Sequence, residues 1–134
     1  MRRPLSLIAL ASLTLSGAFA QGADDCANAQ PITGLGPHAF DNTSATATPG
    51  LADCNGLPVR KDVWFLWTAP STARITFDVC GQTTLETRVA IYDGIDCNNL
   101  GQITCGSIDC SAGSQIRFPA TAGQQFLIRL GSKV

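Results

Sequence analysis

The sequence contains few of the side chains from which catalytic sites are built. Of its 134 residues only 14% are charged, with one histidine, His38, and one glutamate, Glu86. Hydrolysis by a nucleophilic serine needs an adjacent base, and His38 is the sole histidine available, at the start of an expected loop. Glycosidase chemistry needs two carboxylates across a cleft, and nothing around Glu86 indicates a desolvated carboxyl group. We therefore expect no catalytic residues and no enzymatic activity.

Other absences exclude classes of ligand. The formal net charge is −1, whereas nucleic-acid binding needs a basic stripe that displaces phosphate counterions. No two cysteines have the C-x-x-C spacing of a zinc site, and there is only one histidine to join them. Gly34 and Gly36 do not precede an expected helix, so they form no phosphate-binding loop. We expect neither nucleic acid, zinc nor nucleotide phosphate as a ligand.

A hydrophobic run long enough to span a membrane is also missing. Residues 1–20 combine positive charges at Arg2 and Arg3 with an apolar stretch shorter than the roughly 20 residues of a spanning helix. Ala18 and Ala20 then form an A-x-A cleavage pattern. This arrangement predicts a signal peptide over 1–20 and a mature chain that begins near residue 21. The mature protein is then secreted, periplasmic or attached to the cell surface, and does not span the membrane.

The cysteines that the chain does contain all follow the predicted signal peptide: Cys26, Cys54, Cys80, Cys97, Cys105 and Cys110. An even number of thiols in an oxidising compartment is expected to pair, so we predict up to three disulfides. In a chain this small each bridge matters, because it adds about 3 kcal/mol to a stability of about 5 to 15 kcal/mol.

The dominant pattern in the mature chain is alternation of apolar and polar side chains, which is typical of half-buried strands. This alternation predicts strands at 74–79, 87–92, 115–118 and 125–130. At 62–68 both faces are apolar, so we expect a central strand that is covered on both sides. Turn residues separate the runs, and no long helical pattern occurs. The predicted fold class is all-β, an antiparallel β-sandwich or jelly roll, in a single domain over 21–134.

The region before this central strand is less regular. Asp24 or Asp25 is positioned to cap one helical turn that stops before Pro31. Residues 39–42 are predicted to form a short edge strand. Small residues, glycine and proline at 43–60 predict a long surface loop that one disulfide ties down.

Six cysteines allow 15 pairings, and the expected strand layout favours one of them. One bridge would hold the long loop, a second would close a hairpin across a short glycine-containing segment, and a third would join two strand-end turns at one end of the sandwich. In this order the predicted pairs are Cys26–Cys54, Cys97–Cys105 and Cys80–Cys110.

Several short motifs occur in a recognisable order. They are DVWF at 62–65, TAP at 68–70, CG at 80–81, TRVAIYDG at 87–94, and ATAG at 120–123 running into FLIR at 126–129. In order and spacing they resemble the bacterial prepeptidase C-terminal domain, and more narrowly its cysteine-rich secreted relatives. The resemblance covers about residues 25–131. It implies a jelly-roll-like β-sandwich that serves as a non-catalytic appendage of secreted peptidases and surface proteins, some of which bind calcium, polysaccharide or collagen-like polymer.

The chain departs from that family in two places. Relatives carry a pair of acidic residues before the last cysteine, whereas this chain has only Asp109 there, so a cation site at that point would lack one carboxylate. Relatives also continue past the strand that contains Arg129 into a glycine-rich turn and a closing strand. We therefore expect either a domain truncated before its last strand, as part of a longer protein, or an open position in the last sheet.

Two sets of residues are candidates for ligand binding. The first is a turn rich in oxygen ligands, which calcium prefers, and consists of Asp93, Asp96, Asn98 and Asn99. These residue types are also ordinary in turns. The second set comprises aromatic side chains that could stack on sugar rings, Tyr92, Trp64 and Trp67. The two tryptophans are three apart on a strand and point to opposite faces, so the alternative is that both belong to the core.

The sequence as a whole predicts a non-catalytic secreted or cell-surface module that binds a polymer or tethers or stabilises a larger secreted protein. The expected partner is an extracellular polysaccharide or protein polymer. No cofactor is expected apart from the candidate calcium ion. One alternative is an accessory module of a secreted hydrolase, such as a peptidase, whose catalytic domain lies outside this chain. The other is a structural unit of an extracellular adhesive or envelope assembly.

Overall fold

The computed structural model describes residues 21–51, 54, 56–106, 108–109 and 113–133. The predicted signal peptide lies outside the described residues, so its cleavage stays a prediction. No helix in the described ranges is long and apolar enough to cross a membrane.

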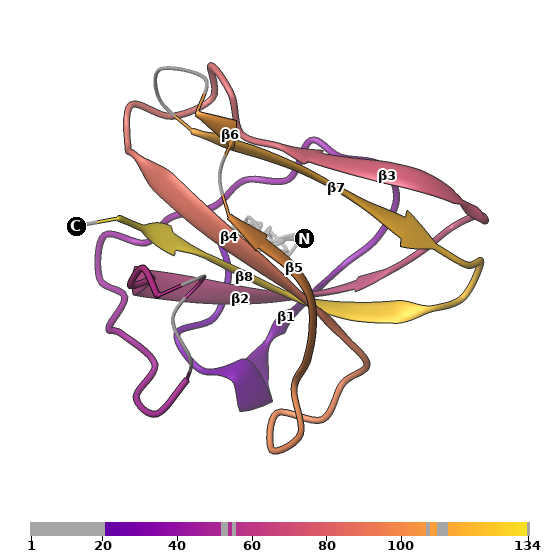
Figure 1. Ribbon diagram of the computed structural model, residues 1–134, viewed down its shortest axis with the longest axis horizontal. Helices are drawn as coiled ribbons and strands as arrows, with labels where there is room; N and C mark the ends of the chain where they lie inside the picture. The colour runs from indigo at the N-terminus through magenta and orange to yellow at the C-terminus, as the bar shows by residue number, and fades with distance from the viewer. Residues whose placement is uncertain (1–20, 52–53, 55, 107, 110–112, 134) are drawn as a thin grey trace, which may run out of the picture.

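Two sheets packed face to face make up the fold, which confirms the predicted all-β sandwich (Figure 1). The five-stranded sheet has the order β1-β2-β8-β4-β5 and the three-stranded sheet the order β3-β7-β6. The strands of the first sheet are β1 (Gln30–Ile32), β2 (Arg60–Thr68), β8 (Gln125–Ser132), β4 (Thr87–Asp93) and β5 (Gly101–Gly106). Those of the second are β3 (Ala73–Asp78), β7 (Ser114–Ala120) and β6 (Ile108–Asp109). Every run predicted from alternation overlaps one of these strands.

The edges of the five-stranded sheet differ from the prediction. The expected edge strand at 39–42 is wrong, because β1 occupies that edge and runs parallel to β2. Ile32 of β1 and Phe40 both pack against the core. Phe40 does so outside any strand, and the N–H of the next residue, Asp41, donates to Gln21 O at 3.0 Å. β8, the last described strand, lies between β2 and β4 and is therefore not an open edge.

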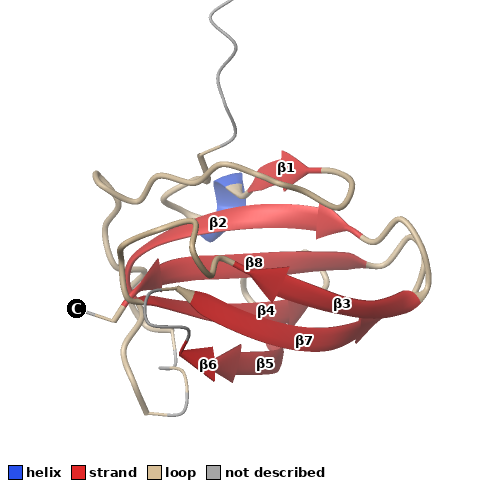
Figure 2. Cartoon of the chain, turned by 90° about the horizontal axis from the view of Figure 1, so that it is seen from above, coloured by secondary structure: helices blue, strands red, loops and turns tan. Residues whose placement is uncertain are grey.

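The main core lies between the two sheets. At its centre are Trp67, Phe118 and Phe126, whose ring centroids lie between 5.1 and 6.2 Å apart. A smaller apolar cluster, around Trp64 and Tyr92, lies on the opposite, outer face of the five-stranded sheet. The 3-10 helix η1 (Cys26–Asn28), which Figure 2 shows on the side of β2 away from β3, covers this outer face together with the later loop that contains Leu51. β2 is thus buried on both faces, as its sequence predicts.

The turn at η1 forms as predicted, but its capping does not. Asp25 occupies the N-cap position and makes no side-chain capping hydrogen bond. The neighbouring carboxylate of Asp24 bonds instead to Thr46, in the loop at 43–59. The acidic side chain therefore attaches a distant loop to the N-terminal segment.

Two predicted disulfide pairs are wrong. Cys26 pairs with Cys97, with a Cα–Cα distance of 5.9 Å, and Cys54 pairs with Cys105, at 5.5 Å. The predicted hairpin bridge fails because β4 and β5 pair with Ala90 opposite Cys105, which leaves Cys97 in the turn beyond the end of the ladder. η1 lies over the outer face near that turn, and the loop at 43–59 crosses the same face toward β5.

The third predicted pair cannot be compared directly. Cys80 is disulfide-bonded, and its predicted partner, Cys110, lies outside the described residues. Structural disulfides such as Cys26–Cys97 and Cys54–Cys105 are typical of proteins that fold in an oxidising compartment.

Candidate functional site

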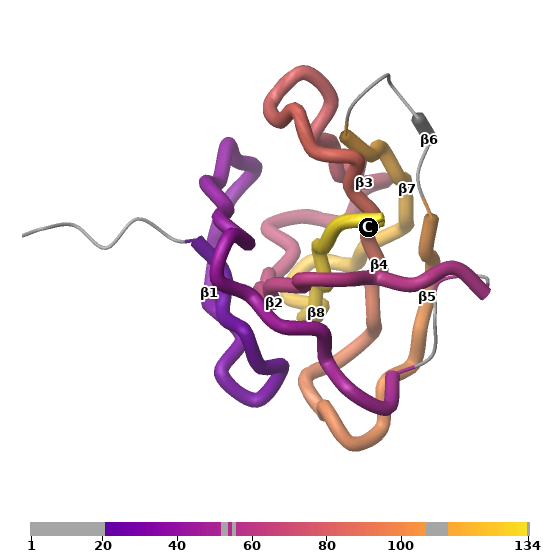
Figure 3. The backbone as a smooth tube through the Cα atoms, turned by 90° about the vertical axis from the view of Figure 1, so that its left-hand side faces the viewer, coloured from indigo at the N-terminus to yellow at the C-terminus, as the bar shows by residue number. Residues whose placement is uncertain are grey.

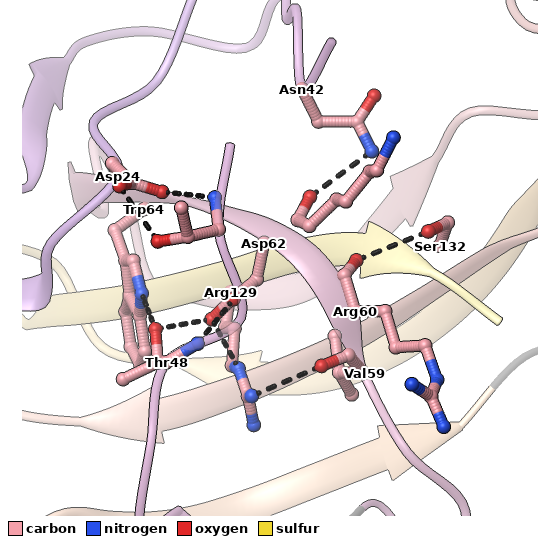
Figure 4. Close-up of polar contacts among 11 residues, drawn as sticks. Asp24, Asn42, Thr48, Val59, Arg60, Asp62, Trp64, Arg129 and Ser132 are labelled. Atoms are coloured by element: carbon pink, nitrogen blue, oxygen red, sulfur yellow. Dashed lines mark hydrogen bonds and ion pairs between the residues drawn. The ribbon is translucent and has the colours of Figure 1, made fainter. Parts of the chain in front are cut away.

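A buried ion pair organises the outer face of the five-stranded sheet (Figure 4). Arg129 Nε of β8 lies 2.7 Å from Asp62 Oδ2 of β2, and the two side chains are 3% and 0% exposed. Moving a charge out of water costs several kcal/mol for each ion, so such a pair needs further hydrogen bonds to its polar atoms.

Thr48 supplies those bonds to the carboxylate. Its backbone N–H donates to Asp62 Oδ1 at 2.8 Å and its hydroxyl to Oδ2 at 2.6 Å, while Trp64 Nε1 donates to the Thr48 hydroxyl at 3.0 Å. Asp24 holds Thr46 in the same way, through the backbone N–H and the hydroxyl. The loop at 43–59 is thus held by hydrogen bonds at two positions, Thr46 and Thr48. Because both oxygens of Asp62 are occupied, this carboxylate stabilises the fold and is not placed to act on a ligand.

Arg129 is held from its other side by the loop and by an aromatic ring. Its Nη2 donates to Val59 O at 3.3 Å, and its guanidinium carbon lies 5.8 Å from the centroid of the Trp64 ring. Nη1 is buried without a hydrogen-bond partner among the described residues. Trp64 in turn stacks on Tyr92, with ring centroids 5.6 Å apart.

The environment of Tyr92 predicts a pH dependence. Burial raises the pKa of the Tyr92 phenol above its ordinary value of 10.0, and the nearby Arg129 offsets part of this rise. The unfolded chain ionises its tyrosine at lower pH than the folded protein does. The raised pKa means that the protonated Tyr92 phenol favours the folded state. Its contribution to the free energy of unfolding should be complete below a pH of about 10 and decline as the pH rises toward the folded-state pKa.

Spectrophotometric titration measures this directly, because Tyr92 is the only tyrosine in the chain. We expect the phenolate absorbance of the native protein to appear at higher pH than that of a tyrosine model peptide. In urea unfolding, Tyr92→Phe should remove this residue's contribution to the loss of stability at high pH. A native midpoint at or below that of the peptide would contradict the prediction.

The three aromatic side chains considered for sugar stacking are all buried, which rules them out as an exposed platform. Trp64 is 0% exposed, Trp67 5% and Tyr92 4%. The two tryptophans do point to opposite faces, as predicted, and each face is covered by other parts of the chain. Both therefore belong to apolar clusters, which is the alternative that their size favours.

The four residues of the candidate calcium turn lie at the end of β4 and in the turn that follows it, and the two carboxylates already accept hydrogen bonds. Asp93 Oδ1 accepts a hydrogen bond from Gln124 Nε2 at 3.0 Å. Asp96 Oδ1 accepts one from the backbone N–H of Asn98 at 2.9 Å, and its carbonyl accepts one from Asn99. Among the described residues, no group of three or more His, Cys, Asp and Glu side chains is arranged to hold a metal ion. Calcium binding by this turn stays a prediction.

An apolar groove opens along one side of the sandwich, between the two sheets. It has a volume of about 380 Å³ and is named the side groove here. One wall is the segment 34–40, which follows β1, and the other is formed by Ile75 and Phe77 of β3. Its floor includes Phe65, Trp67 and Phe118 from both sheets. Figure 3 shows the backbone of the segment after β1 on the same side of the five-stranded sheet as β3.

A few polar groups lie at the rim of the side groove. Trp67 Nε1 donates to Gly34 O at 2.8 Å, which fixes the segment 34–40 above the floor. His38 contacts the backbone of the same segment, with Nε2 at 3.2 Å from Gly36 N and 3.5 Å from Gly34 O. His38 thus helps to shape a wall, and no described carboxylate is bonded to it. Asp78 lies on the opposite rim.

Sequence reasoning missed the side groove. The alternation at 74–79 correctly assigns the inward side chains of β3, but it does not reveal that no described strand occupies the neighbouring position in the sheet. A clue was present in Pro37 and the glycines around it, because a segment of this composition pairs poorly as a strand. The groove exists because the segment 34–40 forms a wall of the sandwich without pairing with β3.

Comparisons of the chain with protein-family models, with curated proteins and with solved structures found no match.

Proposed function

We propose that this protein is a secreted or cell-surface β-sandwich module without catalytic activity, which binds a polymer or tethers or stabilises a larger secreted protein. The observation that carries the proposal is the side groove. Its walls are apolar, and its volume of about 380 Å³ falls within the usual range of ligand sites. The resemblance of the chain to the prepeptidase C-terminal domain supports the same role, since that family provides non-catalytic modules.

The way the polar side chains are used also supports a binding role. Asp62 and Arg129 neutralise each other inside the fold, and Asp24 holds the loop at 43–59. The sole histidine, His38, contacts backbone atoms of its own segment. None of these groups faces a partner that would make it a nucleophile or a general base. Apolar contact in the side groove is therefore the interaction on which the proposal rests.

A retention experiment tests this function. The mature protein is passed over insoluble polysaccharides and over fibrous protein polymers, and we expect one of these classes to retain it. Ile75→Lys places a charge on the groove wall and should weaken retention by about tenfold or more, which corresponds to roughly 1.4 kcal/mol. Incubation with peptide, ester and glycoside substrates should give no turnover.

Ile103→Lys is the matched control, because Ile103 is an exposed isoleucine of β5 that does not line the groove. It should leave retention unchanged. Thermal melting of both variants establishes that each is folded. Equal retention of the Ile75→Lys variant and the parent protein, or hydrolysis that depends on His38, would contradict the proposed function.

A further inference from the structure

The open edge of β3 borders the side groove. β3 is the end strand of the three-stranded sheet, and within the described part of the chain no strand pairs with its outer edge. Nor does any backbone hydrogen bond among the described residues join the segment 34–40 to β3. An unpaired edge presents backbone donors and acceptors to any strand that approaches it.

The register of the β3–β7 ladder identifies the free backbone groups. Val79 N donates to Ser114 O at 3.0 Å, which extends the ladder by one hydrogen-bonded pair. Such pairs alternate along an antiparallel ladder, so Arg74 and Thr76 fall between them and direct their N–H and C=O groups to the open edge. Pro119 fits this register, because it lies opposite Arg74 and has no N–H to donate.

The side chains of β3 define what would fit beside it. Ile75 and Phe77 point into the groove and are half-buried, while Arg74, Thr76 and Asp78 are exposed on the outer face. Arg74 and Asp78 carry opposite charges and lie two residues to either side of Thr76. A strand centred on Thr76 would therefore meet a positive charge at one end and a negative charge at the other.

We propose that the side groove binds an extended segment of another polypeptide, which pairs antiparallel with the open edge of β3. This inference rests on the proposed binding function and assigns a polypeptide as the polymer. From its N-terminus the segment reads basic, apolar, polar, apolar, acidic. The basic residue faces Asp78 and the acidic residue faces Arg74, while the two apolar side chains enter the groove. Strand addition of this kind takes affinity from main-chain hydrogen bonds and specificity from alternate side chains.

The shape of the groove favours a single strand over a second copy of this chain. If a second copy paired its β3 with this open edge, the β7 of that copy would lie next to the added strand, in the plane of the three-stranded sheet. The segment 34–40 lines the groove opposite β3 and would meet that second β7. A small apolar molecule would fill the groove but would leave the N–H and C=O groups of Arg74 and Thr76 unpaired.

The test uses synthetic peptides and the mature protein with its disulfides intact. The matched peptide is acetyl-Gly-Lys-Val-Thr-Ile-Glu-Gly-amide. One control exchanges its lysine and glutamate, and a second replaces Val-Thr-Ile by Thr-Val-Thr, which turns the apolar side chain outward. Calorimetry should show the matched peptide binding at least tenfold more tightly than either control. Hydrogen exchange followed by NMR should show the Arg74 and Thr76 amides slowed by the matched peptide.

Three variants test the geometry. Thr76→Pro removes an edge N–H that the β3–β7 ladder does not use, and should abolish peptide binding, whereas Thr76→Val should retain it. The double variant Arg74→Glu with Asp78→Lys should prefer the charge-exchanged peptide. That reversal of preference would not follow from a general loss of stability.

Other results would overturn the proposal. They are equal affinity for all three peptides, protection of other amides with Arg74 and Thr76 unchanged, or binding only of a small apolar dye. If light scattering shows that the protein self-associates and Thr76→Pro abolishes this association, the open edge of β3 binds a second copy of the chain instead. If a polysaccharide retains the protein in an Ile75-dependent manner and no peptide binds, the proposed function stands and this inference fails. If neither polymer nor peptide binds, both fail.

Discussion

Replacing Asp62 by asparagine should lower the free energy of unfolding by about 3 to 5 kcal/mol, the usual effect of removing one partner from a buried ion pair. Arg129 is 3% exposed, and without Asp62 its charge would stay buried and uncompensated. Thr48 would also lose the carboxylate that accepts two of its hydrogen bonds. Since typical domains are stable by about 5 to 15 kcal/mol, this single change could unfold much of the protein. Urea unfolding followed by tryptophan fluorescence measures the effect.

Two further variants separate charge burial from a general effect of substitution. Asp25→Asn makes the same chemical change at an exposed N-cap that forms no side-chain bond, and should alter stability by less than about 0.5 kcal/mol. The double variant Asp62→Leu with Arg129→Met removes both charges and should recover much of the loss. A stability loss below about 1 kcal/mol for Asp62→Asn would show that the pair is not the anchor of this face.

Removal of the Cys54–Cys105 disulfide by changing both residues to serine should cost about 4 kcal/mol, because the bridge spans 51 residues and the entropy of the unfolded loop grows with length. Removal of Cys26–Cys97, which spans 71 residues, should cost a similar amount. In either double variant the loop or turn on the outer face loses a covalent attachment. Limited proteolysis should then cut first between residues 43 and 59 in the variant without Cys54–Cys105, and in the turn after β4 in the variant without Cys26–Cys97.

Disulfide mapping provides the direct measurement. Digestion without reduction, followed by mass spectrometry, should recover one linked peptide pair containing Cys26 and Cys97 and another containing Cys54 and Cys105. No free thiol should be found in the mature protein. A linked pair of Cys26 with Cys54, or of Cys97 with Cys105, would refute the connectivity and restore the pairing that the strand pattern alone favours.

Short-range patterns were sufficient for five of the eight described strands, β2, β3, β4, β7 and β8, but did not assign β1, β5 or β6. In β3 the alternation of Ile75 and Phe77 with polar neighbours predicts which face is inward, because successive side chains on a strand point to opposite sides. In β2 the unbroken apolar run around Trp64 predicts a strand covered on both faces, and the structure places a separate apolar cluster on each. These predictions succeed because each depends on residues within one strand.

The predictions that failed concern residues far apart in the sequence. Cys26 and Cys97 are 71 residues apart, and they meet because η1 lies on the outer face beside the turn after β4. The side groove likewise depends on where the segment 34–40 comes to lie relative to β3. Neither arrangement has a local pattern, since each depends on how loops cross a sheet once the strands have paired.

By itself, the sequence determined the all-β class and the positions of β2, β3, β4, β7 and β8, because their apolar side chains follow the pattern of a strand. Tertiary structure alone decided the roles of the polar and sulfur-containing side chains. It made Asp62 a buried partner of Arg129, Cys54 a partner of Cys105 and Trp67 a floor of the side groove. The physical reason is that burial and pairing of these side chains depend on distances between segments far apart in the sequence. Those distances are determined jointly by the packing of the two sheets and by the path of the loops.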